Sequence, residues 1–208
     1  MTSAAIHGGE QTMSESPKIS SIEQACLFLS DWFGWKQSLE GPPLDPGLEI
    51  PDAIQTINRH LGQFWLHPSS ANVLNQQDRL IPPQHYAAEP GGVIPIAFEN
   101  QGVWAIGYKP DTGSRLWVTG DWPDDLRGDA EWRQTPHAID PALIFVLLAN
   151  AVWSAPDCAM DEEDDKPADA DCLLWSFAPF AGFSGFWTDR DMSLIRMQGA
   201  GWGVTARR

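Results

Sequence analysis

Apolar residues recur with a helical period near the start of the chain. From Ile22 to Phe33 they fall at i, i+4, i+7 and i+11, a spacing that gives a helix one buried face. We expect this helix to begin at Ser20, because Glu23 follows three residues later in the spacing of a capping box.

A second helical pattern lies in the segment IPDAIQTINRHLG, residues 50–62. Its isoleucines and leucine share one face, Pro51 suits the first turn of a helix, and Gly62 suits the C-terminal cap. The next four residues, QFWL at 63–66, are short and apolar, so we interpret them as a strand.

The segment VIPIAFENQGVWAIGYKP, residues 93–110, has the composition of strands. Its two β-rich runs, Val93–Phe98 and Val103–Tyr108, are joined by a four-residue turn that ends in glycine, which predicts a hairpin. Pro95 has no N–H to donate, so it should lie at a sheet edge or a bulge. RLWVTG, residues 115–120, supplies a third strand of a meander.

The last third of the chain opens with a strongly apolar helix. Asp140 and Pro141 form a start signal, and residues 142–153 are apolar almost all round, so this helix should be the most buried one. The remaining residues predict two or three more short strands. Helices, then strands, then one buried helix indicate an α+β fold with a mixed, largely antiparallel β-sheet packed against helices.

The length of 208 residues suits one domain with appendages. Residues 1–19 are small and polar, so we expect a disordered N-terminal tail followed by a single α+β domain at 20–208. The first residues lack the basic and apolar regions of a signal peptide, and the longest apolar run, 142–149, is too short to cross a bilayer. These features predict a reduced, cytoplasmic protein that does not enter membranes.

The formal net charge of −15 is concentrated in one segment, 157–171, where eight acids stand against one lysine. We interpret this segment as a solvated acidic loop. Its charge should repel nucleic acid and attract a basic protein partner. The candidate partner-binding residues are therefore Asp157, Asp161, Glu162, Glu163, Asp164, Asp165, Asp169 and Asp171.

Catalytic and metal-binding motifs are not evident. The run DEEDD at 161–165 lacks the alternation and central glycine of a calcium loop, and the three cysteines have no metal-ligand spacing. In GFSGF the glycine after Ser184 comes one residue too soon for a nucleophile elbow. We therefore expect no enzyme activity, no cofactor and no metal.

Eleven tryptophans are an unusual number for this length. Trp104 and Trp153 lie in apolar runs and should be in the core, whereas Trp132, Trp187 and Trp202 lie in polar or glycine-rich surroundings. Exposed aromatics of the second kind favour a protein interface or stacking on a sugar, and both remain open.

Three segments in order resemble the SUKH superfamily, a group of bacterial immunity proteins related to yeast cell-wall regulators. They are IPDAIQTINRHLGQFWL, NQQDRLIPP and GGVIPIAFENQGVWAIGYKP, and the resemblance covers about residues 48–120. It implies an α+β domain that binds and neutralises a cognate toxin, often a nuclease or a nucleic-acid deaminase. Because such proteins inhibit by binding, the resemblance supplies no catalytic residue.

The leading hypothesis is thus an immunity protein that neutralises a basic toxin by stoichiometric protein–protein interaction. One alternative is a scaffold or regulatory module of the same fold with another protein partner. A further alternative is a hydrolase whose site is assembled in space and is not visible in the sequence.

Overall fold

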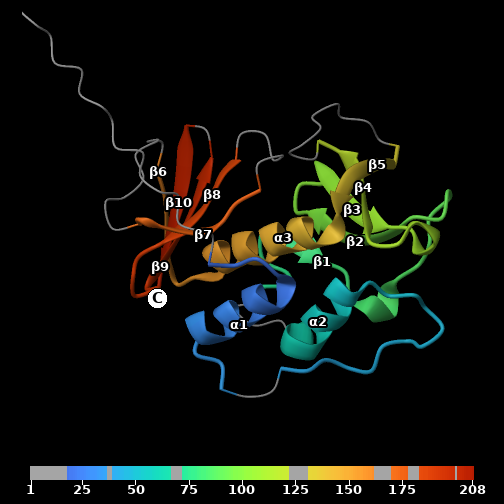
Figure 1. The fold of residues 1–208 in the computed structure, drawn as a ribbon, viewed down its shortest axis with the longest axis horizontal. Helices are drawn as coiled ribbons and strands as arrows, with labels where there is room; N and C mark the ends of the chain where they lie inside the picture. The colour runs from blue at the N-terminus through green and yellow to red at the C-terminus, as the bar shows by residue number, and fades with distance from the viewer. Residues whose placement is uncertain are drawn as a thin grey trace, which may run out of the picture.

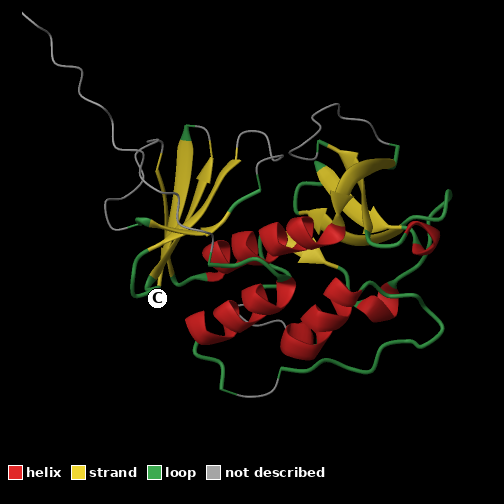
Figure 2. Ribbon diagram, viewed as in Figure 1, coloured by secondary structure: helices red, strands yellow, loops and turns green. Residues whose placement is uncertain are grey.

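Two antiparallel sheets are joined by one long helix in the computed structural model, which describes residues 18–36, 39–66, 72–121, 131–161, 170–177, 183–199 and 201–208 (Figure 1). The fold is α+β, as expected, but its strands form two five-stranded sheets (Figure 2). Three α-helices are described: α1 (Ile22–Trp32), α2 (Asp52–Leu61) and α3 (Ile139–Ser154).

The first sheet is a meander with the strand order β1-β2-β3-β4-β5. Its strands are β1 (Asp78–Leu80), β2 (Ile94–Glu99), β3 (Trp104–Tyr108), β4 (Arg115–Gly120) and β5 (Arg133–Ala138). The predicted hairpin is confirmed as β2 and β3, and the register shifts next to Pro95, as expected for a bulge. The Glu99 carboxylate closes the turn by accepting hydrogen bonds from the backbone N–H groups of Gln101 at 2.7 Å and Val103 at 3.2 Å.

The second sheet has the strand order β6-β10-β9-β8-β7. Its strands are β6 (Asp157–Asp161), β7 (Cys172–Trp175), β8 (Phe183–Thr188), β9 (Leu194–Gly199) and β10 (Trp202–Arg207). The prediction of an acidic loop was wrong for residues 157–161, because their backbone pairs with β10 along all five residues. Backbone pairing of this kind does not depend on the charge of the side chains that alternate above and below the strand.

The first two helices begin and end close to the predicted positions. The cap of α1 is Ser21 rather than Ser20, and its hydroxyl accepts a hydrogen bond from the N–H of Gln24 at 3.2 Å. Pro51 and Gly62 flank α2 as expected. The predicted strand at 63–66 was wrong: a 3₁₀ turn, η1 (Gly62–Trp65), continues directly from α2, so no sheet partner is reached.

Helix α3 lies at the centre of the molecule, with the two sheets on one side and α1 and α2 on the other (Figure 1). Twelve of its sixteen residues are buried, which confirms the prediction that it is apolar almost all round. It begins at Ile139, just before the expected start signal. One hydrophobic cluster includes side chains from α3 and from both sheets.

The start of the described chain is tied to the second sheet. The backbone N–H groups of Lys18 and Ile19 donate to the carbonyls of Leu173 and Leu174 on β7, at 3.2 and 2.9 Å, and the Ile19 side chain is buried. The predicted disordered tail was therefore wrong for residues 18 and 19, because an apolar side chain and two backbone bonds hold them. Residues 1–17 lie outside the described part.

A single polar side chain, the amide of Asn150, links α3 to the segment that leads into β1. Its oxygen accepts from the backbone N–H groups of Gln77 at 2.9 Å and Asp78 at 2.7 Å. Its nitrogen donates to the carbonyls of Val73 at 3.0 Å and Asp78 at 2.8 Å. Both acceptor positions and both donor positions of the amide are therefore occupied, so the buried side chain leaves no hydrogen-bonding group unsatisfied.

We predict that Asn150→Leu lowers the free energy of unfolding by about 3–5 kcal/mol, because two buried N–H groups and two carbonyls lose their partner. Ser154→Ala on the same helix is the matched control. The Ser154 hydroxyl is buried and has no hydrogen-bond partner among the described residues, so its removal should change stability little. Urea unfolding of both variants checks this, and equal losses would contradict the assigned role of Asn150.

Candidate functional site

The acids predicted to bind a partner do not form one surface where the structure describes them. Asp157 and Asp161 are the first and last residues of β6, and Asp171 lies just before β7 at the opposite edge of the same sheet. Glu162, Glu163, Asp164, Asp165 and Asp169 lie outside the described residues.

Asp161 has a structural partner within the sheet. Its two carboxylate oxygens accept hydrogen bonds from Nη1 and Nη2 of Arg196 at 2.7 and 2.9 Å. The Arg196 side chain is fully buried, and its Nε donates to Gln198 at 2.6 Å. It lies over Gly203, where a Cβ atom would come within 2.0 Å of the guanidinium. Asp161 therefore supplies the counter-charge for a buried arginine.

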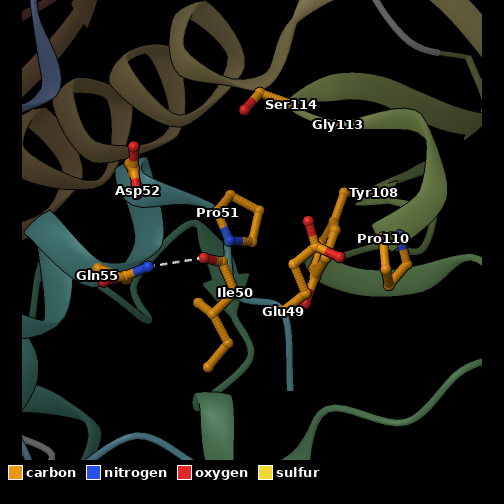
Figure 3. A pocket seen from close by; sticks show the side chains of 9 residues that line it. All are labelled: Glu49, Ile50, Pro51, Asp52, Gln55, Tyr108, Pro110, Gly113 and Ser114. Atoms are coloured by element: carbon orange, nitrogen blue, oxygen red, sulfur yellow. Dashed lines mark hydrogen bonds between the residues drawn. The ribbon is translucent and has the colours of Figure 1, made fainter. Parts of the chain in front are cut away.

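An acidic pocket of about 320 Å³ lies between the start of α2 and the segment after β3 (Figure 3). Glu49, Pro51, Asp52 and Gln55 form one wall, and the other includes Tyr108. The amide of Gln55 donates to the carbonyl of Ile50 at 2.8 Å, which fixes the turn that carries the two acids.

Electrostatics in this pocket disfavour further negative charge. Burial, and then the nearby charge of Glu49, raise the pKa of Tyr108 to about 12. Burial also raises the pKa of Asp140, and Asp52 raises it further, although a bond to its own backbone N–H acts in the opposite direction. The buried Tyr108 hydroxyl has no hydrogen-bond partner within the described ranges. The pocket can thus offer the carboxylates of the exposed residues Glu49 and Asp52 to a positively charged donor.

A second cavity, the aromatic cleft, has a volume of about 310 Å³ and lies between the two sheets. Its floor is a stripe of α3 that includes Phe145, Ala149 and Trp153, spaced four residues apart so that they share one helix face. Trp104 of β3 lines the side of the first sheet. The second sheet contributes Met160, Met197, Trp202 and Val204.

Among the described residues that line this cleft, Asp78 is the one with a carboxyl group. Its carboxylate accepts no hydrogen bond from any residue that the structure describes, and the residue is 4% exposed. Burial, and then the charge of Glu99, its register partner on β2, raise the pKa of Asp78 to about 7. A cation in the cleft would relieve both effects.

The other sequence candidates are not assembled into a catalytic or metal group in the described part of the chain. Ser184 is exposed on β8, and no histidine is among the described residues that line the acidic pocket or the aromatic cleft. No group of three histidine, cysteine, aspartate or glutamate side chains has the geometry to hold a metal there. Across the same residues, none of the helices has the length and apolar character needed to cross a bilayer.

Comparison with protein-family models, curated proteins and solved structures finds no match to this chain. The resemblance to the SUKH superfamily therefore stays a prediction from sequence.

Sequence reasoning singled out Trp202 as a candidate for ligand or partner contact, and this residue lines the aromatic cleft, but it assembled neither cavity. Glu49 and Tyr108 are distant in sequence, as are Asp78 and Trp202, so no local spacing joins them. One signal was present. Asp78 alternates with Leu80 across Arg79, and this period of two places the acid on the buried face of β1.

We predict that Asp161→Ala lowers the free energy of unfolding by about 2–3 kcal/mol, because the buried Arg196 loses its bidentate partner. Asp157→Ala, at the exposed start of the same strand, removes the same charge and should cost less than about 0.5 kcal/mol. Chemical denaturation distinguishes the two, and an equal effect would argue against a structural role for Asp161.

Ionisation of Asp78 should make stability depend on pH. Its folded pKa of about 7 lies above the value of about 3.9 in an unfolded chain, so the protonated form is favoured on folding. The stabilisation of the folded protein by protonated Asp78 is fully present below about pH 4, and it is lost as the pH rises through about 7. Relative to Asp78→Asn, the natural protein should lose roughly 3 kcal/mol between pH 4 and pH 8.

Urea unfolding across this pH range measures the difference between the two proteins. Asp191→Asn, which removes an exposed acid from the turn between β8 and β9, is the control and should run parallel to the natural protein. A pH-independent difference between the natural protein and Asp78→Asn would contradict the raised pKa.

Proposed function

We propose that this chain is an immunity protein that binds a cognate bacterial toxin in the cytoplasm and neutralises it by stoichiometric contact. The toxin would carry a basic surface, as nucleases and nucleic-acid deaminases do. The observation that carries the proposal is the acidic pocket, which offers the exposed carboxyl-bearing residues Glu49 and Asp52. In this proposal it receives a lysine or arginine side chain of the toxin.

The basic side chains that follow the lining residues Tyr108 and Ser114 in the sequence are engaged elsewhere. Neither lysine nor arginine is among the described residues that line it. The ammonium of Lys109 lies over the ring of Trp117, 4.8 Å from its centroid, and Arg115 donates to the carbonyl of Pro136 at 2.6 Å. The carboxylates are therefore left for a partner, and charge-assisted hydrogen bonds to them are about twice as strong as neutral ones.

The net charge of −15 supports the same partner at longer range. A strongly negative protein accelerates encounter with a positive one, and the acceleration falls as salt is added. The same charge disfavours direct binding of nucleic acid. The segment from 157 to 171 contributes to this attraction in the proposal, although Asp161 is already paired with Arg196.

The test is a titration of the purified protein with the toxin encoded beside it, together with a growth-rescue assay. We expect the double variant Glu49→Gln/Asp52→Asn to weaken binding about 10- to 100-fold, because a buried charge pair is lost. The double variant Asp121→Asn/Asp191→Asn removes the same charge from exposed sites elsewhere and should change the affinity less than about threefold.

Two results would contradict the proposal in different ways. If the natural protein neither binds nor protects against that toxin, the immunity function is wrong. If it binds and protects, but the pocket variant behaves as the control does, the contact lies elsewhere. Neutralising residues 162–165 in a third variant then tests the acidic segment.

A further inference from the structure

The aromatic cleft combines features that are uncommon on an ordinary protein surface. Its lining includes Trp104, Phe145, Trp153 and Trp202, and these side chains come from three elements: β3 of the first sheet, α3, and β10 of the second sheet. Three of these four aromatics are only partly buried and pack against the hydrophobic cluster to which Trp104 belongs, so the rings line a cavity at the margin of the core. A buried carboxyl-bearing residue, Asp78, stands in the same wall.

We propose that this cleft binds an alkylated ammonium group, with the aromatic rings surrounding the cation and Asp78 as its counter-charge. Indole and phenyl faces carry negative electrostatic potential and attract cations, most strongly when water is excluded. The carboxylate adds a full charge. This site is separate from the acidic pocket and does not depend on the proposed immunity function.

The position of the carboxylate is fixed by the fold. Both the N–H and the carbonyl of Asp78 are bonded to the side chain of Asn150, on the same helix that forms the floor of the cleft. Leu80 is buried on the same face of β1, so the strand cannot turn Asp78 outward without exposing Leu80. The counter-charge is thus held in place before any ligand arrives, which lowers the entropic cost of binding.

The placing of the acceptors favours an alkylated ammonium over an unmodified basic side chain. A lysine ammonium has three donors and an arginine guanidinium has five, and each donor that enters a cavity needs an acceptor. Among the described residues that line the cleft, the consecutive residues Gln77 and Asp78 carry the side-chain acceptor oxygens, and the others are apolar or aromatic, so donors that face the rest of the lining find no acceptor. A trimethylated nitrogen has a positive charge and no donor, so it leaves nothing unsatisfied.

A quaternary ammonium can come from a small molecule or from a methylated lysine in a peptide. The cleft volume of about 310 Å³ accommodates either head group. We therefore use choline as the small-molecule probe and a trimethyllysine peptide as the second probe. An otherwise identical peptide with unmodified lysine completes the set.

Titration followed by NMR tests the proposal, since methyl protons on a nitrogen enclosed by aromatic rings shift upfield. We expect choline to bind at least about tenfold more tightly than 3,3-dimethylbutan-1-ol, its neutral analogue of the same shape. Asp78→Asn should weaken choline binding about tenfold, and Trp153→Leu about fivefold. Glu49→Gln, in the acidic pocket, should leave the affinity unchanged within a factor of two.

The comparison between choline and its neutral analogue uses the natural protein, so it does not depend on the folding of any variant. Equal binding of the two, or no upfield shift with either quaternary probe, overturns the proposal. Equal affinity for the trimethylated and unmodified peptides also overturns it, because donors would then carry no penalty. If the proposal holds, the tighter of choline and the trimethyllysine peptide identifies the source of the head group.

Discussion

Four hydrogen bonds to the amide of Asn150 hold the segment from Val73 to Asp78 against α3, and the layout of the first sheet depends on them. Strand β1 is only three residues long, and its ladder to β2 is correspondingly short. A strand of this length has little stability of its own. The buried amide compensates by attaching the strand to the central helix, which is itself anchored by apolar packing against both sheets. The position of Asp78, and with it one wall of the aromatic cleft, follows from this attachment.

Much of the first sheet and all three helices could be predicted from sequence because their signals are local. The ENQG turn between β2 and β3, the bulge at Pro95 and the stripe of α2 each lie within a few consecutive residues. The second sheet was harder. In β6 the sequence DCAMD shows no alternation of apolar and polar residues, and its strand geometry is imposed by β10, more than forty residues away. Strand formation that depends on a distant partner gives no recognisable pattern within a few consecutive residues of the sequence.

Both cavities are formed by residues that are distant in sequence. The density of acidic residues along the chain therefore predicted the segment 157–171 as the binding surface, and neither of the two cavities. The density of acids at 157–171 is visible in the sequence, but the pairing of Asp161 with Arg196 is not. Arg196 lies within the run LIRMQG, where one charge among apolar residues gives no sign that it is fully buried. The acids of the pocket, Glu49 and Asp52, are isolated charges in the sequence. They form an acidic site only in the folded protein, where Tyr108 and Asp140 lie near them.

The two sheets have four edge strands, and each edge strand carries a feature that hinders pairing with another strand. β1 is short, β5 contains Pro136, and β7 is covered by Lys18 and Ile19. In the described part of the chain, β6 is paired on one side only, and it carries an aspartate at each end. A strand from a second copy would place its own two aspartates against this charge. Because Asp161 is already paired with Arg196, it is Asp157, at the start of β6, that disfavours the pairing of this edge with a second copy, whether or not another partner is present.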